Sequence, residues 1–528
     1  MPPSVLSALA CTLFFSLVAC GGDDASKNGA NSDGYGDGTQ PVNIDTAELE
    51  HTSGGQSWTV LVYMVADNNL EPFALLDIEE MINVGSNDNF HLVLELDRAP
   101  GYTDDGIAGI ANFENTKRFL VKKGSLQELD DLGEINTGDP TNLANFVTWG
   151  AKAYPSDKLG IILWDHGSAW PGFGADETSD FDGLTLTELA GGFSTGLGDA
   201  NLSSFNLIGF DACLMGSLET ALALRPFGEY LVGSEELEPG HGWDYTAFAK
   251  SAAMPSVNAT DLGKQIIDGY KSQANSDDWQ DGSNITLALV DLYNLKAIER
   301  SLRDLQSAYK DDDSTKIARV RQTTLEFGVQ PNPQDSAGMI DLSSFATGLV
   351  AEVSALVTPA SALVNNVKAA VVYSVAGSAL ATAKGLSVYW PAYASYYNTD
   401  YDKLSQMTYW RKFLDSVQAA TSSVTKVEFI RPQDVVVQAV QSSYLFAGQL
   451  TASSAPSAVA AGLYYGYTDY DSGTKFILGD TSGLVQDDIA GALWDFTVLT
   501  MTQGSSIAPV YYSFAVNSDG GATASIPF

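Results

Sequence analysis

The chain has 528 residues, 45% of them hydrophobic, which is enough for two or three domains that each have a core. Its 27 basic and 65 acidic residues give a formal net charge of −38. Such a surface repels nucleic acid and anionic lipid headgroups, which argues against DNA, RNA or polybasic membrane binding and favours cationic substrates. The same charge is also typical of a secreted acidic protein that simply stays soluble.

The N-terminus begins with an apolar stretch, 5–18, that has the length of a signal-peptide core and is short for a membrane span. Residues 17–21, Leu-Val-Ala-Cys-Gly, resemble the lipobox of bacterial lipoproteins, although residues 1–4 carry no Lys or Arg. The resemblance implies a signal peptide at 1–19 and a lipid on Cys20; an ordinary cleaved signal or a short anchor is the alternative. We therefore expect a protein of the bacterial cell envelope, lipid-anchored at the outer membrane or cell surface, or secreted.

Three regions of different composition follow the signal. Residues 20–56 are rich in Gly, Asp, Asn, Ser and Thr, which predicts a flexible, acidic and polar linker. Residues 57–420 alternate strand and helix patterns, which predicts an α/β domain with a mostly parallel sheet and helices on both faces. Residues 421–528 hold short aromatic-rich strands between Asp, Ser and Gly turns, which predicts a C-terminal all-β module similar to a small sandwich.

The elements expected within the α/β domain follow from hydrophobic periodicity and helix-capping residues. In chain order, strands are expected at 58–66, 91–96, 116–121, 159–164, 205–210, 230–234, 285–290 and 386–390. Helices are expected at 70–82, 139–154, 184–190, 214–224, 295–309, 345–357 and 403–419.

Two of the expected strands end in a reactive side chain. The strand at 159–164 leads to His166 and Gly167, and the strand at 205–210 leads to Cys213. Because parallel strands place their carboxyl ends at one edge of a sheet, we expect a base beside a nucleophile. Each residue taken alone also has an ordinary structural explanation, since a cysteine after a strand is often a small buried hydrophobe.

These residues suit a cysteine peptidase, which needs a thiolate, a base that also protonates the leaving amine, and donors for the oxyanion. We expect Cys213 to open a helix whose N-terminus lowers the pKa of the thiol. Gly167 lets the backbone approach a substrate carbonyl closely. The backbone N–H groups of Gly167 and Cys213 are therefore the expected oxyanion donors. If Cys20 carries a lipid, Cys213 is the only free thiol of the mature chain, and no disulfide forms within it.

The two strand ends read Ile-Ile-Leu-Trp-Asp-His-Gly at 161–167 and Leu-Ile-Gly-Phe-Asp-Ala-Cys at 207–213. Together they resemble the clostripain family of cysteine peptidases, and the resemblance covers roughly residues 57–419. It implies a caspase-like fold and hydrolysis of peptide bonds after Arg or Lys through a thioester acyl-enzyme. His166 and Cys213 would be the catalytic dyad, and the substrates would be proteins or peptides with a basic P1 residue. A non-catalytic cell-surface binding protein on the same scaffold is the alternative.

A basic P1 side chain needs an acid at the floor of its pocket. Asp211 matches the family position that lines this pocket; its alternative role is to cap the helix expected at Cys213. Asp244, in the loop after the next strand, is a second candidate for substrate binding. Glu235, Glu236 and Glu238 are weaker ones.

The segment between the dyad residues, 167–212, bears on activation and on metal binding. It contains no Lys or Arg, although the family typically cuts itself there after a basic residue, so we expect activity as one chain or a cut elsewhere. Calcium is the one candidate cofactor, because calcium dependence is known in the family and hard cations bind several carboxylates. The candidate ligands do not have EF-hand spacing, and they are Asp176, Glu177, Asp180 and Asp182.

Two other chemistries are not supported by the sequence. Residues 192–196 match the Gly-x-Ser-x-Gly elbow of serine hydrolases, but that elbow needs a buried strand before its serine, and a helix is expected here. Four histidines without a His-Glu-x-x-His pattern, and no paired cysteines, argue against zinc.

Overall fold

The computed structural model describes residues 57–330, 335–422 and, with gaps, 428–525. The expected signal peptide at 1–19, the linker at 20–56 and the lipidation site Cys20 lie outside the described residues. Among the residues that are described, no helix has the length and hydrophobicity needed to cross a bilayer.

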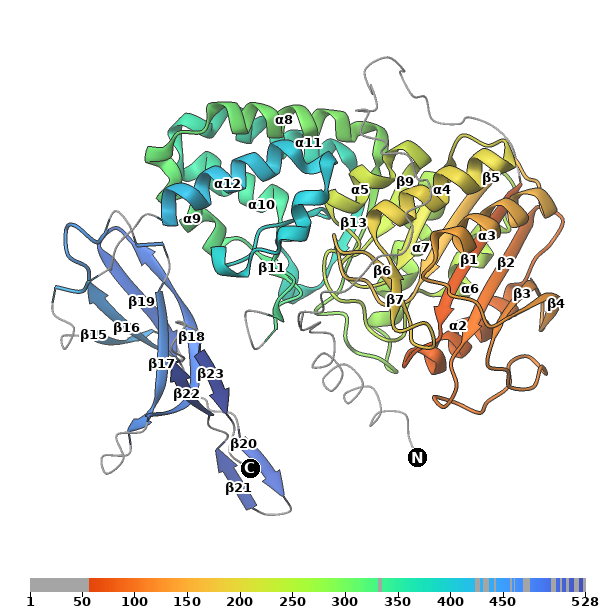
Figure 1. The fold of residues 1–528 in the computed structure, drawn as a ribbon, viewed down its shortest axis with the longest axis horizontal. Coiled ribbons are helices and arrows are strands. Elements are labelled where there is room, and N and C mark those ends of the chain that lie inside the picture. The colour runs from red at the N-terminus through yellow and green to blue at the C-terminus, as the bar shows by residue number, and fades with distance from the viewer. Residues whose placement is uncertain are drawn as a thin grey trace, which may run out of the picture.

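A nine-stranded sheet forms the centre of the α/β domain (Figure 1). Its strands, in chain order, are β1 (Trp58–Ala66), β2 (Phe90–Arg98), β3 (Thr116–Lys122), β4 (Ser125–Gly133), β5 (Lys158–Trp164), β8 (Phe205–Asp211), β9 (Gly228–Gly233), β10 (Thr286–Asp291) and β13 (Val371–Ala376). They are arranged in the order β13-β10-β9-β8-β5-β1-β2-β3-β4. The central strands from β9 to β2 pair in parallel, and the strands at both edges are antiparallel. The predicted mostly parallel sheet is therefore confirmed.

Helices cover both faces of this sheet (Figure 1). They are α2 (Glu71–Val84), α3 (Pro140–Ala153), α4 (Leu186–Ala200), α5 (Leu218–Leu224), α6 (Tyr245–Ala252) and α7 (Ala259–Ala274). Every residue of β1, β5 and β8 is buried, because these strands are nearly continuous apolar runs that face a helical layer on each side. One core packs α3, α4 and α5 against the sheet, for example through Phe146 and Phe193; the other packs α2, α6 and α7, through Met81 and Ile266.

A second helical layer adjoins the sheet beside the end of β8. It contains α8 (Leu295–Ala308), α9 (Ser314–Thr323), α10 (Leu342–Glu352), α11 (Val357–Ala370) and α12 (Thr408–Ser422), with a small sheet of β11 (Glu326–Phe327), β12 (Met339–Asp341) and β14 (Ser387–Tyr389). The Ser387 N–H of β14 donates to the Gly216 carbonyl at 3.0 Å. This layer therefore supports the loop that carries Cys213.

The C-terminal region is all-β, as the sequence predicts. Its main sheet is antiparallel and contains β15 (Val436–Val440), β16 (Ser443–Gln449), β17 (Ala461–Thr468), β18 (Lys475–Gln486), β19 (Ile489–Trp494), β22 (Tyr512–Val516) and β23 (Ala522–Ser525). The strands β20 (Thr500–Gln503) and β21 (Ser506–Pro509) form a separate hairpin. Arg319 of α9 links this region to the helical layer by donating to the carbonyls of Ala455 and Ala458, at 2.6 and 2.8 Å.

Several helices differ from their predicted bounds, and two of these, α4 and α5, bear on the predicted chemistry. The helix expected at 184–190 extends as α4 to Ala200, and it starts at a capping box between Thr185 and Glu188. Residues 192–196 therefore lie inside a helix, where no nucleophile elbow can form. The helix expected from residue 214 begins only at Leu218.

Candidate active site

The carboxyl ends of β5 and β8 bring His166 and Cys213 together. The two strands pair in parallel with Trp164 opposite Asp211, and each reactive residue follows two positions later. Gly167 lies against the main chain of Cys213, where an added Cβ would come within 2.1 Å of the Cys213 carbonyl oxygen. The two predicted dyad residues therefore lie beyond paired ends of neighbouring strands, and the close backbone approach requires glycine at position 167.

The imidazole of His166 is oriented by Asn69. Its Nε2 lies 2.9 Å from the Asn69 side-chain oxygen, so Nε2–H donates and Nδ1 remains the basic nitrogen. Burial lowers the pKa of His166 to about 4, because the charged imidazolium loses hydration. The ring is therefore neutral near neutral pH, which is the state a general base requires.

The segment that carries Asn69 is itself hydrogen-bonded to Asp165 and Ala175, which lie on either side of His166 in the sequence. The side-chain amide of Asn68 donates to the Asp165 carboxylate at 2.8 Å and to the Ala175 carbonyl at 2.9 Å. The second Asp165 oxygen accepts from the Ala175 N–H at 2.7 Å. Asn69 was not a predicted site residue. The sequence feature that could have indicated it is the Asp-Asn-Asn run at 67–69, which follows β1, the strand next to β5.

The predicted helix N-terminus at Cys213 is wrong. Leu214 has a φ of 64°, and Gly216 donates its N–H to the Ser234 carbonyl at 2.7 Å, so the chain runs along β9 before it can coil. The helix α5 starts after Ser217, which caps it, so Cys213 does not open this helix. Instead the Glu238 N–H points at the Cys213 sulfur at 3.3 Å, which favours the nucleophilic thiolate.

The backbone N–H of Gly167 donates to no group among the described residues, whereas the nearby Ser168 and Gly174 N–H groups donate to Gly172 and His166. It is available for a substrate carbonyl at the position expected of an oxyanion donor. Cys213, whose N–H is the other expected donor, lies in the turn that follows β8.

Asp211 is buried beneath the dyad, where its carboxylate accepts from the Trp243 N–H at 3.2 Å and from the Tyr245 hydroxyl at 2.9 Å. Burial raises the pKa of Asp211 to about 6. Glu238 adjoins it and accepts from the Trp243 indole at 3.0 Å. Because no helix begins at Cys213, Asp211 does not serve as a helix cap.

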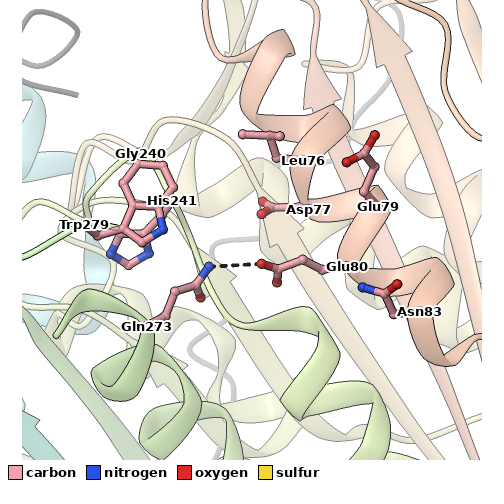
Figure 2. A pocket seen from close by; sticks show the side chains of 9 residues that line it. All are labelled: Leu76, Asp77, Glu79, Glu80, Asn83, Gly240, His241, Gln273 and Trp279. Carbon is pink, nitrogen blue, oxygen red and sulfur yellow. Dashed lines mark hydrogen bonds between the residues drawn. The ribbon is translucent and has the colours of Figure 1, made fainter. Parts of the chain in front are cut away.

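A cavity of about 240 Å³ lies between α2 and the loop that follows β9 (Figure 2). Asp77 and Glu80 of α2 face His241 across it, and Gln273 of α7 donates to Glu80 at 3.2 Å. Burial raises the pKa of Glu80 to about 7. Asp77 and Asp211 meet at Gly242, where an added Cβ would lie 3.1 Å and 3.0 Å from their carboxylate oxygens. The acidic side chains therefore extend from Asp211 into this cavity.

The remaining substrate-binding candidates bind backbone groups. Asp244 caps α6 by accepting from the Ala247 N–H at 2.7 Å. Glu235 accepts from the Gly385 N–H at 2.7 Å, and Glu236 accepts from the Gly328 N–H at 3.0 Å. Each has a structural role in the loops around the site.

The four expected calcium ligands are not brought together as a set. Asp176 ends β6 (Phe173–Asp176) and is buried, whereas Asp180 and Asp182 are exposed near the turn into β7 (Asp182–Leu184). The Glu177 carboxylate accepts from the Tyr102 hydroxyl at 2.7 Å.

Comparison with known proteins assigns the chain to a family. The sequence model of the Clostripain family matches residues 62–417. The chain belongs to the clostripain family. Membership of this family favours a cysteine peptidase over the alternative of a non-catalytic binding protein.

Individual relatives of this clostripain-family peptidase are distant. Clostripain of Hathewaya histolytica is 29% identical over 222 residues, which are 36% of this chain and 41% of the relative's own length. A secreted C11 cysteine protease of Bacteroides thetaiotaomicron, solved with an irreversible peptide inhibitor, has a TM-score of 0.50 at 21% identity, covering 69% of this chain and 99% of that one. An inactive zymogen C11 protease of Parabacteroides distasonis has a TM-score of 0.52 at 20% identity, covering 68% and 99%. These structures confirm the predicted caspase-like fold.

The Asn69 contact predicts a specific kinetic defect. Asn69→Ala removes the acceptor that orients His166, and we expect kcat to fall about tenfold, since one such hydrogen bond is worth roughly 1–1.5 kcal/mol. KM should change little, because Asn69 orients the base and is not expected to contact substrate. Asn69→Asp keeps an acceptor oxygen and is the matched control. Unchanged kcat in a folded Asn69→Ala variant would contradict this role.

Proposed function

We propose that this peptidase is a surface-tethered endopeptidase that cleaves after Arg or Lys, with His166 and Cys213 as its dyad. The observation that supports the proposal is the parallel register of β5 and β8, in which Trp164 and Asp211 are paired two residues before His166 and Cys213. The lipobox resemblance at Cys20 supports the tether; metabolic labelling with a fatty acid checks it, and an unlabelled wild-type protein would refute it.

In the proposed mechanism, His166 Nδ1 accepts the thiol proton as the Cys213 sulfur attacks the substrate carbonyl carbon. The Gly167 and Cys213 N–H groups stabilise the oxyanion of the tetrahedral intermediate. His166 then protonates the leaving amine, and the acyl group stays on sulfur as a thioester. A water molecule, deprotonated by His166, hydrolyses the thioester and restores the thiol.

The basic P1 preference is supported by buried carboxylates that lack a basic partner. Among the described residues, no Lys or Arg forms an ion pair with Asp77, Glu80, Asp211 or Glu238. Burial raises the pKa of each of these groups, so each loses hydration that a bound cation would offset. A guanidinium or ammonium group on the substrate supplies that charge.

A fluorogenic peptide with Arg at P1 tests the dyad. We expect Cys213→Ala and His166→Ala each to lower turnover by roughly 10³-fold or more. The two residues act in the same step, so the loss of one costs about as much as the loss of both. Turnover should decrease in the order Arg, Lys, Ala and Glu at P1. Equal turnover of Arg and Glu would exclude the acidic pocket, and full activity in Cys213→Ala would exclude the mechanism. Intact mass of the active sample should show no cut within 167–212.

The pKa of Asp211 predicts the acid limb of the pH profile. Its carboxyl is protonated, and therefore uncharged, below about pH 6 in the free enzyme, so kcat/KM for an Arg substrate should fall as pH decreases through that value. His166 stays neutral down to about pH 4 and does not set this limb. A bound P1 cation lowers the pKa of Asp211, so the limb in kcat should lie at lower pH. Asp211→Asn should lower kcat/KM and change the limb, to which Glu80 also contributes because burial raises its pKa to about 7. An identical limb in that variant would contradict the assignment.

A further inference from the structure

The carboxyl groups of Glu235 and Asp341 are buried in contact with each other. Glu235 follows β9, Asp341 ends β12, and the two residues are 1% and 0% exposed. A hydrogen bond joins their side chains. No Lys, Arg or His in the described part of the chain forms an ion pair with either residue. The contact therefore has no basic side chain to balance its charge.

The hydrogen bonds around the two carboxyl groups show where a proton would lie. Both oxygens of Asp341 accept from the backbone, from the Ser344 N–H at 2.6 Å and the Lys384 N–H at 2.6 Å. Glu235 Oε2 accepts from the Gly385 N–H at 2.7 Å, whereas its Oε1 is buried without a donor among the described residues. Two carboxylates in contact cannot both stay charged in a buried site at low cost. A proton on Glu235 Oε1, donated to Asp341, satisfies the unpaired oxygen and removes one charge.

The surrounding charges also favour a proton on Glu235. Burial, and next the charge of Asp341, raises the pKa of Glu235 well above its usual range. Burial also raises the pKa of Asp341, but the two backbone N–H groups that it accepts from lower it. The neighbouring Glu236 directs its carboxylate to the Gly328 N–H at 3.0 Å, and Lys384 is exposed.

The two carboxyl groups connect segments that both bond to Gly216. The Gly216 N–H donates to the Ser234 carbonyl at 2.7 Å, and the Gly216 carbonyl accepts from the Ser387 N–H at 3.0 Å. Ser234 immediately precedes Glu235, and Ser387 lies two residues beyond Gly385. The bond from Gly385 to Glu235 therefore ties together the two segments that hold Gly216.

The segment that begins at Glu235 also contacts the nucleophile. The Leu214 N–H donates to the Glu236 carbonyl at 3.1 Å. The Glu238 N–H points at the Cys213 sulfur at 3.3 Å. A displacement of this segment would therefore change the position of the thiol and remove the N–H that favours its thiolate.

We propose that Glu235 and Asp341 share one proton and, by joining these segments, position Cys213 for attack. The proton makes the contact attractive, and its loss would leave two buried negative charges that repel each other. Both are positioning residues, since they act through the backbone around the thiol. The effect on the reaction rests on the proposed function, whereas the shared proton does not.

The shared proton can be measured without activity in the full-chain Cys213→Ala protein. In a Glu235→Gln variant of it, the amide N–H donates to Asp341 and the amide oxygen accepts from Gly385, as the protonated carboxyl does. Between the ordinary pKa of a glutamate and the raised pKa of Glu235, folding takes up a proton. The Tm of the parent should therefore fall relative to that of the Gln variant as pH rises, by several degrees in total.

The matched control is Glu236→Gln, the same substitution one residue later at an acid that accepts from other backbone groups. Its Tm should follow the pH dependence of the parent. A Tm difference between parent and Glu235→Gln that does not change with pH would refute the shared proton. The same change of pH dependence in Glu236→Gln would refute it as well.

The positioning role is tested in the wild-type enzyme with an Arg substrate, whose guanidinium stays charged at alkaline pH. The kcat of the wild type should fall as pH rises through the pKa of Glu235, and Glu235→Gln should retain kcat there. Asp341→Asn turns an amide N–H₂ toward a backbone N–H, so kcat should be roughly tenfold lower at every pH.

The same pH profile of kcat in wild type and Glu235→Gln would refute the positioning role, even if the two proteins differ in Tm. A folded Asp341→Asn variant with wild-type kcat would also refute it. A wild-type enzyme that is inactive at every pH would refute the proposed function and leave the Tm result standing.

Discussion

The parallel pairing of β5 with β8 is the constraint on which the rest of the active site depends. It sets His166 and Cys213 at the same height of the sheet edge, and it allows Gly167 to contact the Cys213 carbonyl. Both strands are fully buried, so a register shift by one residue would exchange side chains between the two cores and disrupt the packing of each. The energy that fixes the dyad is therefore the packing of the sheet, and the loops beyond the strand ends only refine the geometry.

Around this edge, the protein concentrates negative charge in two places. One consists of Asp211 and the acids beside the cavity. The other, the carboxylate cluster, consists of Asp67, Asp97, Glu134 and Asp176, which each have an oxygen within 4.8 Å of the others. Burying carboxylates without basic partners costs stability, so each group is better explained by a cation that binds there. In our proposal the cation beside Asp211 is the P1 side chain of the substrate. The high overall negative charge of the chain would attract such a basic substrate.

The sequence predicts the parts of the site that depend on local hydrophobic patterns. Continuous apolar runs identify the strands that lead to His166 and Cys213, because strands buried on both faces need apolar side chains at every position. The start of α5 could not be predicted, because it depends on a backbone hydrogen bond between Gly216 and Ser234. Asn69 was missed for a related reason: its contact with His166 depends on β1 lying next to β5.

The carboxylate cluster also could not be predicted from local sequence patterns. A search for acids that are close in sequence finds Asp176 beside Asp180 and Asp182, but these point to an exposed turn. The partners of Asp176 are Asp67, Asp97 and Glu134, the first of which lies more than a hundred residues away, and only the fold brings them together. The edge hairpin of β3 and β4 was predicted only in part, since β4 is mostly polar and exposed.

The most direct test of the account is covalent labelling with a peptidyl electrophile that ends in Arg, followed by peptide mapping by mass spectrometry. The account predicts one adduct, on the Cys213 sulfur, formed much more slowly in His166→Ala and in Asp211→Asn. Labelling at any other residue, or equally fast labelling of Cys213 in His166→Ala, would contradict the claim that the two strand ends form one catalytic unit.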